Sequence, residues 1–157
     1  MINKRLRATD QKYRFLQYKI QTIDLATMEI SRSLAVAYQK ITDISKKRHI
    51  TSAKVDSLHH YYKETVLSGD VMRVELVQSV MDSLEGERNN MKALDQLELI
   101  AQQEVVDIKS RLGKELVRKE KYSGLANEVE LSFSRKVEKV RQASSLESYL
   151  LTKRARG

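Results

Sequence analysis

Apolar residues recur every three or four positions along the first 65 residues of this chain. Alternate steps of three and four from Leu6 reach 18 positions, of which 13 are apolar or Tyr. A 3.5-residue repeat kept for about eight heptads is typical of a helix that packs along a narrow seam against another helix. It predicts one long helix over about 6–67. The predicted seam positions are Leu6, Thr9, Tyr13, Leu16, Ile20, Ile23, Thr27, Ile30, Leu34, Ala37, Ile41, Ile44, Arg48, Thr51, Val55, Leu58, Tyr62 and Thr65.

The repeat stops at Leu67, where Ser68, Gly69 and Asp70 follow. Gly can adopt the left-handed conformation that closes a helix, and Asp or Ser can cap the next one. We therefore expect a turn at about 68–70 and a second helix over about 71–150. The apolar positions expected on its seam are Val74, Val77, Met81, Leu84, Met91, Leu97, Ala101, Val105, Ile108, Leu112, Leu116, Tyr122, Ala126, Val129, Phe133, Val137, Val140, Leu146 and Leu150.

The spacing changes within this second helix. Between Leu97 and Leu116 most steps are four residues, which tends toward an 11-residue period and predicts straighter or slightly right-handed winding. Gly86, Gly113 and Gly124 lie along the helix without a neighbouring Pro. They weaken a helix, and we expect them to mark bends rather than ends.

The pattern predicts an all-α fold in which residues 1–157 form one long antiparallel two-helix coiled-coil hairpin. Each arm carries a narrow apolar stripe that needs a partner helix, and the other arm supplies one. The alternative is a three- or four-helix bundle. Its additional breaks would fall in the polar stretch 45–52 and at 85–90, where two Asn residues lower helix propensity.

Composition agrees with few turns and long helices. The chain has no Pro, no Cys, no Trp and five Gly, and 32% of its residues are charged. Without Cys, neither a disulfide framework nor a Cys-based metal site can form. The basic N-terminal stretch lacks the apolar run of a secretory signal, and no stretch approaches the roughly 18 apolar residues of a membrane span. We expect a cytoplasmic protein with no membrane insertion.

The net charge of +8 is concentrated near both ends of the sequence. Residues 1–19 and residues 135–157 each carry a balance of +5, which leaves −2 for the rest. An antiparallel hairpin would bring these segments together as one basic end. Such an end favours an acidic protein, nucleic acid or an anionic membrane face; the alternative is a pair of solubilising tails. The candidate residues are Arg5, Arg7, Lys12, Arg14, Arg135, Lys136, Lys139 and Arg141.

Catalytic patterns are missing from the sequence. No Gly-rich phosphate loop or Gly-flanked nucleophilic Ser occurs, and no known nucleic-acid-binding motif accompanies the basic residues. Asp56, His60 and Glu64 would share a helix face, and we interpret them as solvated polar residues rather than metal ligands. We expect no enzymatic activity, no cofactor, no metal and no nucleic-acid partner.

A second apolar stripe flanks the predicted turn. Met72, Leu76 and Val80 follow one another at intervals of four, offset from the expected seam, and Tyr61 and Tyr62 precede the turn. More apolar surface is present there than a two-helix seam buries. It predicts either a protein-binding face or a surface covered by a further helix or a second subunit.

These features together resemble the stalk proteins of type III secretion, the FliJ/YscO-like family with its SctO-type central stalks. The resemblance covers the whole chain and depends on its size, helical period and charge layout. The stretch Arg118–Tyr122 is also loosely similar to sequences of this family. It implies a non-enzymatic stalk whose paired termini enter the hexameric export ATPase, with the basic residues facing the ring. It also implies contact of the other region with the export gate, possible escort of secretion chaperones, and a position peripheral to the inner membrane. The alternatives are a phasin-like surface-coating protein and a generic coiled-coil scaffold.

Overall fold

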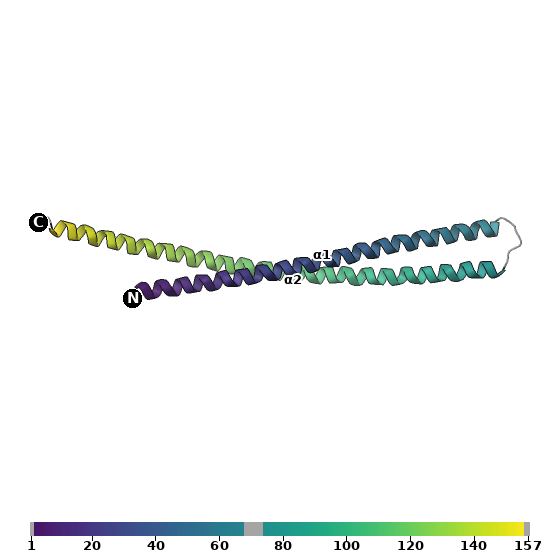
Figure 1. Ribbon diagram of the computed structural model, residues 1–157, viewed down its shortest axis with the longest axis horizontal. Helices are drawn as coiled ribbons and strands as arrows, with labels where there is room; N and C mark the ends of the chain where they lie inside the picture. Colours follow the sequence, from purple (N-terminus) through teal and green to yellow (C-terminus); the bar gives the residue numbers. More distant parts are fainter. Residues whose placement is uncertain (1, 68–73, 156–157) are drawn as a thin grey trace. The chain divides into compact units, whose positions relative to one another are not determined.

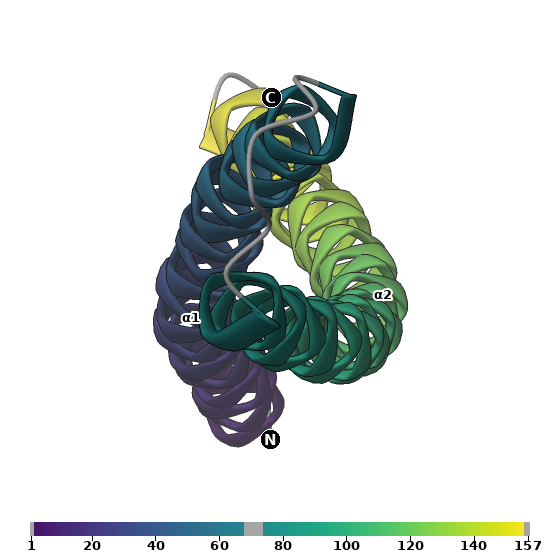
Figure 2. The ribbon, with the colours of Figure 1, turned by 90° about the vertical axis from the view of Figure 1, so that its right-hand side faces the viewer.

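The computed structural model describes residues 2–67 and 74–155, with side chains for 9–66, 74–151 and 153–154. Two α-helices account for these residues: α1, Ile2–Leu67, and α2, Val74–Ala155. They pack antiparallel as a helical hairpin (Figures 1 and 2). The predicted all-α hairpin is therefore confirmed, whereas the predicted turn at 68–70 lies outside the described residues.

Neither helix is interrupted where the bundle alternative required a break. α1 runs through 45–52 and α2 runs through 85–90, so the three- or four-helix bundle is wrong. The reason is that the apolar repeat keeps its phase on both sides of each polar stretch, and no Pro removes a backbone donor. Gly86, Gly113 and Gly124 also lie inside α2 and do not end it.

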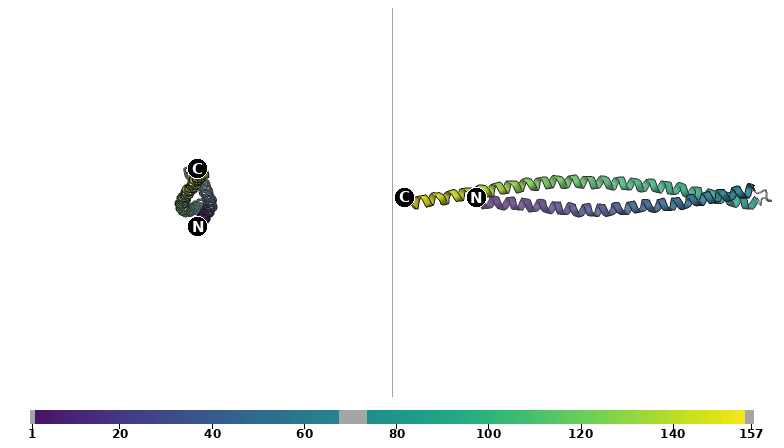
Figure 3. Two further views of the ribbon diagram at one scale, coloured as in Figure 1. Left: turned by 90° about the vertical axis from the view of Figure 1, so that its left-hand side faces the viewer. Right: turned by 90° about the horizontal axis from the view of Figure 1, so that it is seen from above.

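The chain divides into two compact units, each built from one segment of α1 and one of α2. Residues 1–29 and 112–157 form the terminal unit, and residues 30–111 form the inner unit. Figure 3 shows α1 and α2 side by side.

The seam of α1 follows the predicted heptad closely. Among the predicted positions from Thr9 to Thr65, every side chain is buried or half-buried except that of Arg48. Burial is deepest at Ala37, which is 1% exposed, and at Leu16 and Ile23, which are each 4% exposed. The 3.5-residue repeat therefore identified the packing face of α1 correctly.

The seam of α2 is also a strict heptad, and here the predicted change of period is wrong. Leu97 and Leu116 are 51% and 48% exposed, while Leu94 and Glu115 are half-buried in their place. Because α1 keeps a 3.5-residue repeat, α2 must present the same repeat to remain in contact. The seam positions of α2 are Val77, Val80, Leu84, Glu87, Met91, Leu94, Glu98, Ala101, Val105, Ile108, Leu112, Glu115, Lys119, Tyr122, Ala126 and Val129.

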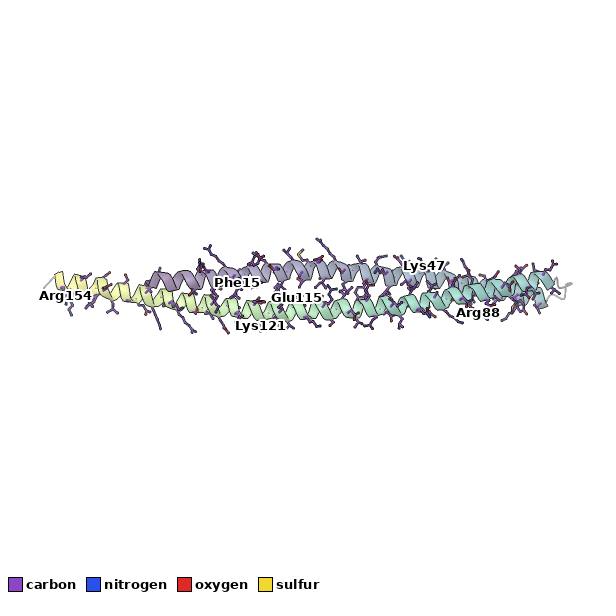
Figure 4. All side chains as sticks on the ribbon, turned by 90° about the horizontal axis from the view of Figure 1, so that it is seen from below. Phe15, Lys47, Arg88, Glu115, Lys121 and Arg154 are labelled. Carbon is purple, nitrogen blue, oxygen red and sulfur yellow. The ribbon has the colours of Figure 1, made fainter. Side chains whose placement is uncertain are left out.

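Four of these α2 positions are charged, which explains why apolar periodicity alone missed the phase. Long charged side chains can lay their methylene groups along a seam while the charge reaches water. Glu115 is an example: it lies on the side of α2 that faces α1 (Figure 4) and its Oε1 is 3.7 Å from Nη1 of Arg118. An apolar count skips such positions and selects neighbouring Leu residues instead.

In the terminal unit, Leu16 packs against Ala126 and Val129, with Tyr13 and Tyr122 beside them. In the inner unit, Ala37 packs against Val105 and Ile108, surrounded by the half-buried residues Ile30, Leu34 and Ile41. The most buried residue of each cluster is an Ala, Ala126 in the terminal unit and Ala37 in the inner unit. Burial of these apolar groups stabilises each unit by about 25 cal/mol per Å² removed from water.

In both units, ion pairs between α1 and α2 join residues that the packing of the apolar clusters places at the same level. In the terminal unit, Lys119 Nζ lies 2.7 Å from Asp24 Oδ1. In the inner unit, Lys40 Nζ lies 3.1 Å from Glu104 Oε2, and Lys54 Nζ lies 3.8 Å from Glu87 Oε1. All are partly exposed and contribute little stability individually, but a register slip would separate each Lys from its carboxylate.

Candidate protein-binding surfaces

Among the described residues, no group of three His, Cys, Asp or Glu side chains could hold a metal ion. His60, one of the three residues considered above, has its Nε2 3.1 Å from Glu64 Oε1. No helix within the described ranges is long and apolar enough to cross a membrane. The candidate functional features are therefore the charged and apolar surfaces of the helices, which could bind other proteins.

The two units differ completely in charge. Residues 30–111 contain 12 Lys or Arg and 12 Asp or Glu, so the inner unit is neutral. The whole net charge of +8 therefore belongs to the terminal unit. A field of one sign concentrated on one unit attracts acidic surfaces and speeds their association.

The terminal unit brings the two basic segments to the same level. Leu16 packs between Ala126 and Val129, so each step toward the start of α1 is matched by a step toward the end of α2. This register sets residues 2–8, which include Arg5 and Arg7, beside 135–141. The side chains of Arg5 and Arg7 lie outside the described set.

The predicted basic residues of α2 are all available to solvent. Arg135, Lys136, Lys139 and Arg141 are exposed, and none forms an ion pair with another described side chain. On α1, Lys12 is exposed as well. An unpaired, solvated cation can meet a carboxylate of a partner without first breaking an internal ion pair.

Arg14 differs from the other basic candidates whose side chains are described, because it is already paired. Its Nη2 lies 3.1 Å from Asp10 Oδ2, one helical turn away, and both side chains are largely exposed. The pair is of the weak surface kind, so it lowers the charge that Arg14 offers without fixing the side chain firmly.

The described side chains of α2 become exposed after Ser132. Every described side chain from Phe133 to Arg154 is exposed, including seam-phase Val140 and Leu150 at 39% and 54%. The expectation that the apolar stripe is buried through Leu150 is therefore wrong: among the described side chains of α2, Ser132 is the last that is half-buried. Arg154 lies near the end of this stretch (Figure 4).

A shallow groove lies where the described seam of the terminal unit ends. Its walls combine the apolar and aromatic side chains of Tyr13, Val129 and Phe133 with the carboxylates of Asp10 and Glu130. Sequence reasoning missed this groove, because nothing in a heptad pattern shows where neighbouring side chains leave space. The terminal unit thus includes a groove lined by both aromatic and acidic residues.

The five residues of the predicted partner face do not share one surface. Tyr61 and Leu76 are 46% and 40% exposed, but Val80 is 8% exposed and faces α1. Tyr62 is a half-buried seam residue of α1, and Met72 lies outside the described residues. Val80 was placed wrongly because the α2 heptad runs through Val77 and Val80.

Because the seam of α2 runs through Val77 and Val80, two residues that were expected in the seam are exposed instead. Val74 and Met81 are 78% and 49% exposed. Met81 borders a groove between the helices that also includes Tyr62, His59 and Arg88. Arg88 Nη2 lies 3.4 Å from His59 Nε2 across this groove. The region before and after the turn therefore carries exposed apolar side chains on two flanks rather than in one stripe.

Comparison with protein-family models, with curated proteins and with solved structures finds no match for this chain. The fold is a coiled-coil-like helical hairpin, and its two units are distinguished by charge: one neutral, the other strongly basic.

Proposed function

We propose that this chain is the non-enzymatic central stalk of a type III secretion export apparatus. In this role the terminal unit enters the hexameric export ATPase, the region around Tyr61 and Leu76 contacts the export gate, and secretion chaperones are further partners. The proposal joins the helical hairpin to the resemblance described above.

The observation that carries this proposal is the segregation of charge. The terminal unit has the full +8, and Arg135, Lys136, Lys139 and Arg141 of α2 are solvated and unpaired among the described side chains. A protein ring lined with acidic or polar loops would complement such a surface. A neutral inner unit would not be drawn into the ring by charge.

A surface-coating role fits the packing less well. A phasin-like protein must open its apolar seam onto a granule or membrane, which would expose residues such as Ile23, Ala37 and Ala126 that are each at most 4% exposed. The seam is completed by the partner helix in both units. Opening it would lose the burial that stabilises each unit.

Binding to a purified hexameric export ATPase tests the proposal. The protein should bind the ring and raise its rate of ATP hydrolysis. Lys136→Glu with Lys139→Glu should weaken binding roughly tenfold and flatten its dependence on salt, because fewer cations meet the ring.

The matched control reverses two exposed lysines of the neutral unit, Lys46→Glu with Lys63→Glu, and changes net charge by the same amount. This control should bind the ATPase nearly as wild type does. Equal weakening by both variants would show a response to net charge alone. Unchanged binding by the first variant would remove the basic end from the proposal.

A further inference from the structure

One flank of the inner unit carries an apolar patch between two ion pairs. Lys47, Ile50, Asn90 and Ala93 border a groove between the helices on this flank. Lys47 is labelled in Figure 4. Because residues of both helices line this groove, it identifies which heptad positions of α1 and α2 lie on this flank.

Residues seven apart in a coiled-coil helix lie on the same side. Leu97 is therefore between Asn90, in the groove, and Glu104, whose carboxylate accepts a hydrogen bond from Lys40. Ile100 follows Ala93 by seven and lies on the same flank. We define the flank patch as Ile50, Ala93, Leu97 and Ile100.

The flank patch is open in the hairpin. Ile50, Leu97 and Ile100 are 57%, 51% and 64% exposed. Charged pairs close it at both ends: Lys40 with Glu104 at one end and Lys54 with Glu87 at the other. At each end the cation belongs to α1 and the anion to α2.

We propose that the flank patch binds a second copy of this chain about a two-fold axis parallel to the helices. This axis sets α1 of one copy over α2 of the other at the same level. Lys40 then meets Glu104 of the second copy, and Lys54 meets Glu87 of the second copy. Such self-complementarity is what a two-fold interface requires.

One apolar contact fits the same arrangement. Ile50 of α1 lies over Ala93 of the second copy, so that a large side chain meets a small one. By the register of Lys40 with Glu104, however, the α1 residues on this flank that are level with Leu97 and Ile100 are Lys47 and Asp43, so the charged pairs rather than apolar area favour the arrangement. The other two-fold arrangement, with the axis across the helices, stacks α1 on α1 and α2 on α2. It brings lysines near lysines and glutamates near glutamates, which costs stability.

The neutrality of the inner unit supports a copy of itself as the occupant. With 12 cationic and 12 anionic side chains, residues 30–111 offer no net charge to repel a like surface. The proposal goes beyond the stalk function and does not depend on it. Because the patch is small, we expect a weak, concentration-dependent dimer.

Sedimentation equilibrium of the full chain over about 1 to 200 µM tests the inference, since small interfaces associate weakly. The measurement uses about 0.15 M salt, where the screening length is about 8 Å and repulsion between the basic terminal units is reduced. A monomer–dimer equilibrium is expected. A monomer throughout this range would overturn the proposal.

Two neighbouring residues give a matched pair of variants. Ile100→Glu introduces a carboxylate into the flank patch and should raise the dimer dissociation constant at least tenfold. Leu99→Glu makes the same chemical change at a 69% exposed position on the other flank of α2 and should leave it unchanged. Circular dichroism checks that both variants remain helical. Equal effects of the two variants would exclude the patch as the interface.

A charge exchange tests the direction of the axis. The variant with Lys40→Glu, Lys54→Glu, Glu87→Lys and Glu104→Lys keeps the ion pairs within each chain and the net charge. The variant should form homodimers as the wild type does. Heterodimers of variant and wild type should be at least tenfold weaker, because Lys of one chain would then face Lys of the other and Glu would face Glu. Mixing that is as strong as self-association, or stronger, would overturn the parallel two-fold axis.

Discussion

Arg48 occupies a seam position of α1, and its Nε lies 3.1 Å from Oδ1 of Asp95 on α2. The same guanidinium has its Nη1 3.1 Å from Oε2 of Glu98. Because the Arg48 side chain remains 47% exposed, the charge stays near water while the rest of the side chain follows the helix surface. This arrangement explains how a cation occupies a seam position in α1 without being buried.

Arg48→Ala should lower the free energy of unfolding by only about 0.5–1 kcal/mol, because exposed pairs are weak. Arg48→Glu should cost more, since it brings a third carboxylate beside Asp95 and Glu98. Urea unfolding of both variants measures the difference. The second change Asp95→Arg should restore part of the stability of Arg48→Glu. No restoration would mean that the two side chains are not coupled.

Ala37 and Ala35 form a matched pair for testing the seam. Ala37 is 1% exposed in the packed cluster of the inner unit, whereas Ala35 is exposed on the same helix. Ala37→Leu should lower the free energy of unfolding by about 1–3 kcal/mol through overpacking. Ala35→Leu should change it by less than about 0.5 kcal/mol. Similar urea midpoints for the two variants would contradict the described seam.

Val80 and Leu76 test the phase of α2. Val80→Ser removes a buried side chain and places a hydroxyl in the seam, which should cost about 1–3 kcal/mol of unfolding free energy. Leu76→Ser should cost less than about 1 kcal/mol because Leu76 is 40% exposed. Thermal unfolding followed by circular dichroism ranks the two. The reverse ranking would support the phase first expected from the sequence.

Gly86 and Gly124 lie in helix interiors, one in each unit. An added Cβ meets nothing within 4 Å at either position. Gly86→Ala and Gly124→Ala should each raise the free energy of unfolding by about 0.5–1 kcal/mol, because Ala loses less backbone entropy on forming a helix. Urea unfolding measures both changes. A loss of stability in either variant would show a close contact that the hairpin itself does not contain.

The two arms differ in how far their sequence predicted their packing. In α1, apolar residues fill most seam positions and no Pro interrupts them, so the period identified Leu16, Ile23 and Ala37 as packing residues. In α2, charged residues at positions such as Glu98 and Lys119 interrupt the apolar series. Leu97 was then selected although the half-buried seam positions on either side of it are Leu94 and Glu98, because hydrophobicity alone does not show which side a helix turns toward its partner.

The candidate surfaces were predictable only in part. The exposed basic residues Arg135, Lys136 and Lys139 follow from composition near the ends of the sequence, since a solvated charge needs no partner to be exposed. The flank patch and the groove beside Phe133 could not be predicted, because each depends on side chains of both helices at one level.

The sequence by itself determined that the chain is all-helical with long helices, because a sustained 3.5-residue repeat without Pro favours long helices with a single packing stripe; that 45–52 and 85–90 do not break them was decided by the structure. The sequence also determined the uneven charge, which is a property of residue order. Only the tertiary structure decided the register and the phase of α2. Both depend on contacts such as Lys119 with Asp24 and Leu16 with Ala126, which join residues far apart in the chain, and local periodicity carries no information about that pairing.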